Sequence, residues 1–195
     1  MKRSLGAKSL VYPTPVFVIG SYGEKGEPNV MTAAWAGICC SKPPAIGVSL
    51  RKATYTYGNI MSHNAFTVNV PSEEMVVQAD YFGMVSGRTE DKFAAVSFTP
   101  VRSDLVDAPY IKECAMVLEC KLIQTHEIGL HTQFIGEIVD VKVDEDALDK
   151  DGICRMSKIR PFLYAPDDQN YYSIGKMLAR GFDSGKAIKP KKRKA

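Results

Sequence analysis

The residues best suited to hold an anion lie in the run Ser49-Leu50-Arg51-Lys52-Ala53-Thr54-Tyr55-Thr56. An apolar strand is expected to end at Arg51, and residues 57–61 are compatible with a helix. A strand end that leads into a helix start presents unpaired backbone N–H groups, which suit an anion. The Arg51 guanidinium and the serine and threonine hydroxyls of the run add further donors. A phosphate monoester fits this donor set, and an ordinary polar turn with an exposed arginine explains it equally well.

A second candidate stretch, residues 29–35, has the sequence Asn-Val-Met-Thr-Ala-Ala-Trp and contains the only tryptophan of the chain. Its small side chains would let a flat ring approach the backbone, and Asn29 and Thr32 would address the polar edge of that ring. An ordinary strand whose Trp35 fills the core is the alternative. Taken alone, the stretch favours this structural interpretation.

His131 is the most interesting of the three histidines, because it follows Gly129 and directly precedes a predicted strand over residues 133–137. Active-site residues gather at such loop positions. A loop histidine is more often an ordinary surface residue, so His131 is a possible catalytic residue and no more.

Several enzyme classes lack their signatures in this chain. It contains no Walker A sequence and no G-x-G-x-x-G between a strand and a helix, which excludes the usual nucleotide-binding loops. It also lacks the H-E-x-x-H and G-x-S-x-G sequences of metalloproteases and serine hydrolases. The five cysteines include no C-x-x-C pair, so no metal site is predicted. We interpret all five, the adjacent Cys39 and Cys40 included, as packing residues or incidental thiols.

The net charge of +3 comes from the C-terminal end of the chain. Five basic residues lie in the last seven positions, and without them the formal charge falls from +3 to −2. A slightly acidic body does not favour nucleic acid as a partner, because such domains cluster positive charge on a folded face. Residues 186–195 are expected to be a disordered basic tail. The chain has no membrane-length apolar run and no signal peptide, which predicts a cytoplasmic protein that does not enter the membrane.

The expected elements are mostly strands. Apolar, β-branched runs predict strands over 15–20, 30–40, 45–50 and 66–70, and alternating patterns predict two more over 114–123 and 139–143. Short helices are expected after Ser72 and after Thr89. Many strands, few helices and no βαβ alternation predict a mainly β fold, a barrel with short inserted helices, in one domain over residues 1–185.

Six segments together resemble the flavin-reductase-like family of FMN-binding split β-barrels, and are most similar to its flavoredoxin branch. They are residues 29–35, 41–44, 48–56, 66–71, 86–93 and 129–137. No single motif among them is diagnostic, but the set in this order is specific. The resemblance extends from Leu10 to about Gly185 and implies a six-stranded Greek-key barrel and a homodimer, with one FMN per subunit near the dimer interface.

The resemblance also implies the roles of individual residues. Arg51, Thr54 and Thr56 would contact the phosphate, and Lys92 would contact the phosphate or the ring. Tyr164 would cover the cofactor from the partner subunit. The full set of expected cofactor contacts is Asn29, Met31, Thr32, Ala33, Trp35, Ser49, Leu50, Arg51, Thr54, Tyr55, Thr56, Lys92, His131 and Tyr164.

One departure from the family pattern bears on function. Many NAD(P)H-dependent flavin reductases of this family have Gly-Asp-His where this chain has Gly129-Leu130-His131. The missing acid argues against direct nicotinamide chemistry. The sequence therefore predicts a flavoprotein that transfers electrons to or from a redox partner. The alternatives are an NAD(P)H-dependent flavin reductase and a non-catalytic binding module that uses the basic tail.

Overall fold

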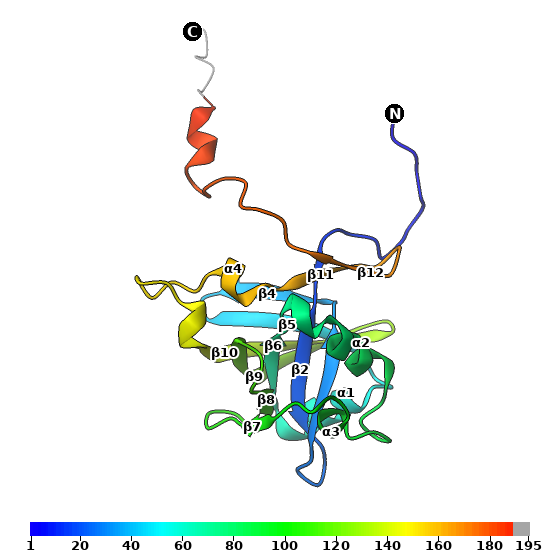
Figure 1. Cartoon of the computed structure of the whole chain (residues 1–195). Helices are drawn as coiled ribbons and strands as arrows, with labels where there is room; N and C mark the ends of the chain where they lie inside the picture. The colour runs from blue at the N-terminus through cyan, green and yellow to red at the C-terminus, as the bar shows by residue number, and fades with distance from the viewer. Residues whose placement is uncertain (189–195) are drawn as a thin grey trace.

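The computed structural model describes residues 1–188, and it is built around one antiparallel sheet of seven strands in the order β3-β2-β6-β9-β10-β5-β4 (Figure 1). These strands are β2 (Phe17–Tyr22), β3 (Pro28–Ala33), β4 (Ala36–Ser41), β5 (Pro44–Arg51), β6 (Ala65–Val70), β9 (Met116–Ile128) and β10 (His131–Val143). β3 and β5 also contact each other, so the sheet curls toward itself. The mainly β prediction is confirmed.

Smaller elements cover and extend this sheet. The helices are α1 (Tyr55–His63), α2 (Val76–Met84), α3 (Lys92–Val96) and α4 (Met156–Ile159), with 3-10 turns η1 (Glu73–Met75), η2 (Glu145–Ala147) and η3 (Ser184–Ala187). One small sheet contains β1 (Thr14–Pro15), β11 (Phe162–Ala165) and β12 (Asn170–Ser173). Another contains β7 (Pro100–Arg102) and β8 (Pro109–Ile111). Within residues 1–188, no helix has both the length and the hydropathy to cross a membrane.

The core has two parts. Inside the curled sheet, Phe66 and Phe134 are fully buried, together with Ile46 and Leu50. A second cluster lies between the sheet and the helices α2 and α3, where Phe82 and Phe93 pack against strand residues such as Val30. The second cluster fixes α2 and α3 on the outer face of β3, and this position brings their ends close to the end of β5.

Three predicted strands differ from the structure. The expected strand over 30–40 is wrong, because the chain bends at residues 34–35 and forms two strands. β3 pairs with β2, whereas β4 pairs with β5, so the bend lets the chain change partners. Residues 133–137 and 139–143 belong to one strand, β10, which contains two register irregularities against β9. The sheet therefore has seven strands where the family resemblance implies six.

The other predicted elements are found close to their expected bounds. The helix expected after Ser72 is η1 with α2, and the one expected after Thr89 is α3, whose N-cap is Asp91. The predicted boundary between the folded domain and the basic tail falls within η3. The remainder of the predicted tail, residues 189–195, lies outside the described residues.

Candidate functional site

A cavity of about 310 Å³ lies where β5 leads into α1, and we call it the anion cavity. Its walls come from β3, from the β5–α1 junction, from the end of α2 with the loop that follows it, and from the start of α3. The lining residues are Asn29, Met31, Arg51, Ala53, Thr54, Tyr55, Thr56, Gly83, Met84, Val85, Ser86, Gly87 and Lys92.

The first turn of α1 supplies backbone donors to this cavity. The Thr54 hydroxyl caps the helix by accepting a hydrogen bond from the Tyr57 N–H, at 3.3 Å. Within the described residues, the N–H groups of Tyr55 and Thr56 have no acceptor. Unpaired N–H groups and the positive end of the helix dipole favour an anion at this position. The exposed Arg51 guanidinium borders the same space.

Lys92 places a buried positive charge at the anion cavity. Its side chain is only 3% exposed, and its ammonium donates hydrogen bonds to the carbonyl oxygens of Val30 at 2.8 Å and Phe82 at 2.9 Å. Among the described residues no carboxylate forms an ion pair with it, and burial lowers its pKa to about 8. An ammonium has three N–H donors. The third is therefore available to a ligand, and an anionic ligand would offset the cost of burying the charge.

Asn29 offers a buried oxygen that no group among residues 1–188 satisfies. Its Nδ2 donates to the Thr56 hydroxyl at 2.9 Å, which fixes the orientation of the amide, while its Oδ1 is buried without a partner. The Gly87 backbone lies so close to this oxygen that a Cβ atom at position 87 would overlap it. A buried polar atom of this kind usually binds a ligand or water. The cavity therefore contains an open acceptor next to its open donors.

A second cavity, of about 410 Å³, adjoins the anion cavity because Gly83 and Met84 line both. We call it the ring cavity, and its lining residues are Val16, Thr32, Ala34, Asp80, Gly83, Met84, Tyr164, Gln169 and Tyr171. Two aromatic side chains from β11 and β12 form one wall, with ring centroids 5.4 Å apart. Apolar and aromatic walls beside a phosphate-type site suit a flat ring attached to a phosphate.

The ring cavity contains one charged side chain, Asp80. Its Oδ1 accepts a hydrogen bond from the Tyr171 hydroxyl at 2.8 Å, and no cation pairs with it within residues 1–188. Burial of the phenol and the neighbouring carboxylate both raise the pKa of Tyr171. Tyr171 is therefore a neutral donor at physiological pH. It holds the carboxylate at the edge of the cavity.

The structure brings half of the expected contact residues together in the anion cavity. These are Asn29, Met31, Arg51, Thr54, Tyr55, Thr56 and Lys92. Thr32 and Tyr164 line the ring cavity, and the Thr32 hydroxyl donates to the carbonyl oxygen of Ala79. Tyr164 does so from its own chain, whereas the resemblance implies that it covers the cofactor from the partner subunit.

The remaining expected contacts lie outside these two cavities. The side chains of Ala33 and Leu50 are in the core, so only their main-chain groups are available to a ligand. Ser49 is half-buried on β5, opposite Gln133. Trp35 lines a separate cavity of about 330 Å³ beside the N-terminal segment.

His131 is the first residue of β10 and pairs directly with Arg51 at the end of β5. Directly opposite residues of an antiparallel pair project to the same face of the sheet. The half-buried His131 therefore lies next to the anion cavity through Arg51, although it is not a wall of it.

Residues 86–93 are part of the family resemblance, but the expected contacts from this segment include only Lys92 and no residue of the loop after α2. Residues 83–87 line the anion cavity opposite Arg51, and Arg88 donates to the Ala53 carbonyl oxygen at 3.0 Å while its guanidinium lies 5.3 Å from the centre of the Tyr55 ring. Asp80 and Tyr171 were also missed. The Ser86-Gly87 pair was the available signal, because glycine allows close approach of the backbone. The contact between this loop and β5 is long-range, and no local pattern reports it.

Comparisons with known proteins identify a family to which this chain is similar. A family model described as "Flavin reductase like domain" matches residues 9–174. An uncharacterised protein of Archaeoglobus fulgidus is 39% identical over 131 residues, which are 67% of this chain and 73% of that protein. The crystallised flavoredoxin of Desulfovibrio vulgaris (Miyazaki F) is 54% identical with a TM-score of 0.91, covering 95% of this chain and 100% of that one. The flavoredoxin of Methanosarcina acetivorans is 31% identical with a TM-score of 0.89, covering 96% and 98%.

Proposed function

This chain belongs to the flavin reductase like family. We propose that it is an FMN-binding flavoprotein that transfers electrons. Two of the solved structures it resembles are named flavoredoxins, which supports this proposal. FMN, when bound, accepts and passes on the electrons. The protein binds the cofactor, orients it and controls the access of water and redox partners to it.

One observation supports this function above the others. The anion cavity holds the buried Lys92 charge, which has no carboxylate partner among the described residues, and it shares Gly83 and Met84 with the adjoining ring cavity. A phosphate in the first cavity and a flat ring in the second match the two ends of FMN. The Asn29 Oδ1 and the N–H groups at the start of α1, which have no partner among the described residues, belong to the lining of the anion cavity.

Arg51, Thr54, Thr56 and Lys92 hold the cofactor phosphate in this proposal. The donors of Arg51, Thr56 and Lys92 come from β5, α1 and α3, so the phosphate also ties these three elements together. The Thr54 hydroxyl donates to the Arg51 carbonyl oxygen at 2.9 Å, so Thr54 acts by fixing the junction between β5 and α1. Thr32 and Tyr164 face the ring, with Asp80 at its edge. His131 lies beside Arg51 and so borders the phosphate end of the site.

A homodimer in the cytoplasm completes the proposal. The long strand β10 exposes two apolar side chains, Val139 and Val141. Exposed apolar side chains of this kind support association with a second copy of the chain. The cysteines form no disulfide among the described residues, which agrees with a reducing compartment. The electron donor or acceptor is a redox partner protein or NAD(P)H.

An NAD(P)H-dependent flavin reductase is the second candidate, and the position of His131 beside Arg51 favours it. Anaerobic mixing of the FMN-loaded protein with NADH or NADPH separates the two functions. We expect a yellow protein that bleaches with dithionite but only slowly with either nucleotide. Rapid bleaching by a nucleotide would make the protein a reductase, and a protein that stays colourless after incubation with FMN would contradict both functions.

A further inference from the structure

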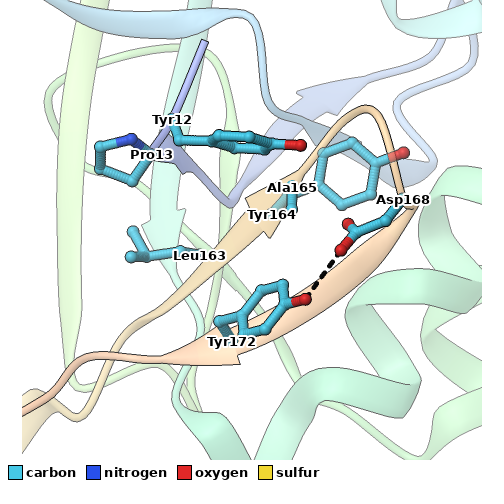
Figure 2. Close-up of a pocket in the computed structure, with 7 residues that line it drawn as sticks. All are labelled: Tyr12, Pro13, Leu163, Tyr164, Ala165, Asp168 and Tyr172. Carbon is cyan, nitrogen blue, oxygen red and sulfur yellow. Dashed lines mark hydrogen bonds between the residues drawn. The ribbon is translucent and has the colours of Figure 1, made fainter. Parts of the chain in front are cut away.

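A further cavity, of about 310 Å³, lies between the N-terminal segment and the β11–β12 hairpin, and we call it the tyrosine cavity (Figure 2). Its lining residues are Tyr12, Pro13, Leu163, Tyr164, Ala165, Asp168 and Tyr172. Figure 2 shows the rings of Tyr12 and Tyr172 on opposite sides of it, with Asp168 at one end and Leu163 at the other. The cavity shares Tyr164 with the ring cavity.

The tyrosine cavity is apolar inside and negative at its rim. Asp168 accepts a hydrogen bond from the Tyr172 hydroxyl at 2.8 Å, and no cation pairs with it within residues 1–188. The neighbouring Asp167 pairs with Lys8 at 3.5 Å. Desolvation raises the pKa of Tyr12 most, and the negative charges of Asp168 and Asp167 raise it further, so both carboxylates act on the cavity. A suitable occupant has an apolar body and a positive charge.

The C-terminal arm, residues 174–188, has this chemistry. Its sequence includes Lys-Met-Leu-Ala-Arg at 176–180. Met177, Leu178 and Phe182 are 86%, 91% and 105% exposed, so these side chains bury almost no surface within residues 1–188. Lys176 and Arg180 form no ion pair within the described part of the chain. Figure 1 shows the arm extending from β12 away from the sheet.

The arm leaves the hairpin close to the tyrosine cavity but does not return to it. β12 runs antiparallel to β11, and after Ser173 the residues from Ile174 to Met177 lie beside α4. Beyond Met177 the chain projects into solvent. Phe182 has a φ of 58°, a conformation that a bulky residue keeps only when its surroundings enforce it. No contact within residues 1–188 does so, because Phe182 is fully exposed there.

We propose that the arm of a second copy of this chain occupies the tyrosine cavity, with Leu178 among the tyrosine rings and Arg180 beside Asp168. The exchange is reciprocal, because in a two-fold dimer each arm meets the same surface of the other subunit. The five residues from Ile174 to Leu178 span up to about 17 Å when extended, which lets Leu178 reach the cavity of an adjoining subunit. The inference rests on the homodimer proposed above. It adds that the docked arm supports Tyr164, a shared wall of the ring cavity.

Cross-linking between two variants tests the exchange directly. In a background of Cys39→Ser and Cys40→Ser, a Leu178→Cys chain is mixed with a Leu163→Cys chain and mildly oxidised. We expect a covalent heterodimer to form. The control replaces Leu163→Cys with Leu105→Cys, an exposed position between β7 and β8, and should give no covalent heterodimer. The double variant Leu163→Cys, Leu178→Cys addresses docking within one chain. A disulfide inside single chains, without covalent dimers, would overturn the proposal.

The dimer dissociation constant, measured by analytical ultracentrifugation, gives an independent readout. Leu178→Asp and Arg180→Glu should each weaken the dimer at least tenfold, whereas Leu105→Asp should not. Adding Asp168→Arg to Arg180→Glu should recover most of the lost dimer affinity, because the pair then has its two charges exchanged. An unchanged dimer in Leu178→Asp, or no rescue, contradicts the arm exchange. A monomeric protein that still binds FMN overturns both the arm exchange and the proposed homodimer, but it leaves the proposed electron transfer by bound FMN intact.

Discussion

The Lys92 ammonium donates hydrogen bonds to two buried carbonyl oxygens and has a third donor for the proposed phosphate. Its pKa is lowered to about 8 by burial, whereas that of an exposed lysine is near 10.5. Between these two values the native state of the free protein has lost a proton that the unfolded state still binds. Stability without cofactor should therefore rise with pH in this interval. An anionic ligand requires the charged form, so its affinity should fall there.

This behaviour gives a pH prediction for cofactor binding. The dissociation constant of FMN should be flat from pH 7 to about 8 and then rise by up to tenfold per pH unit. In Lys92→Met the affinity should be about 10- to 100-fold lower at pH 7, the usual worth of a hydrogen bond to a charged group. The rise above pH 8 should be lost. Fluorescence titration of FMN measures both effects.

Lys52→Met is the matched control. Lys52 follows Arg51 in sequence but pairs with Glu127 at 2.7 Å on the surface and does not line the anion cavity. Its removal should leave both the affinity and its pH profile unchanged. A rise above pH 8 that persists in Lys92→Met would show that another group titrates.

Asp80 should lower the reduction potential of the bound cofactor. A carboxylate at the edge of the ring cavity repels the additional negative charge of reduced FMN more than it affects the oxidised form. In Asp80→Asn the ratio of the dissociation constants for oxidised and reduced FMN should rise about tenfold, which for two electrons is about 30 mV. Spectroelectrochemistry measures the shift. A potential that is unchanged or falls would place the ring away from Asp80.

Among the elements, the packing of β10 against the core depends on a glycine, Gly136, in the part of the strand that pairs with β9. A Cβ atom on Gly136 would lie 2.5 Å from the Phe66 ring and 3.0 Å from the Cys120 Cβ, both of them buried in the core. Gly136→Ala should destabilise the protein by about 1–3 kcal/mol, because the core is overpacked. Gly37→Ala on β4 meets no atom within 4 Å and should be close to neutral. Urea denaturation compares the two, and equal midpoints would mean that the barrel tolerates the added methyl group.

The sequence predicted elements well where one signal dominated. Buried β-branched runs located β5 and β6, and Asp91 with its neighbours marked the start of α3. The sequence did not predict the bend at residues 34–35, because this bend arises where the chain changes strand partners and not from a local turn preference. Whether β10 is one strand or two was likewise decided by its pairing with β9.

The site was predictable for the part of it that is contiguous in sequence. Residues 51–56 form a strand-to-helix junction whose backbone chemistry can be read locally. The loop after α2 and the Asp80–Tyr171 pair reach the site through tertiary packing, and residues 80 and 171 are far apart along the chain. The burial of Lys92 follows from the second core cluster, so its lowered pKa could not be read from its sequence position.

For the molecule as a whole, the two classes of thiol should react differently. Burial raises the pKa of both Cys114 and Cys120 to about 12, whereas Cys39 and Cys40 are exposed on β4. A thiol reagent should modify the exposed pair rapidly in the native protein and the buried pair only after unfolding. Mass spectrometry after timed alkylation locates the modified residues. Rapid native modification of Cys120 would contradict the packed interior of the sheet.

The central claim is that a phosphate and a flat ring occupy two adjoining cavities, and a comparison of FMN with riboflavin tests it most directly. Riboflavin has the same ring without the phosphate. We predict that FMN binds one per chain and at least 100-fold more tightly than riboflavin, and that Arg51→Gln removes at least tenfold of that preference while hardly changing riboflavin binding. Equal affinities for the two flavins, in fluorescence titrations of the native chain, would contradict the claim.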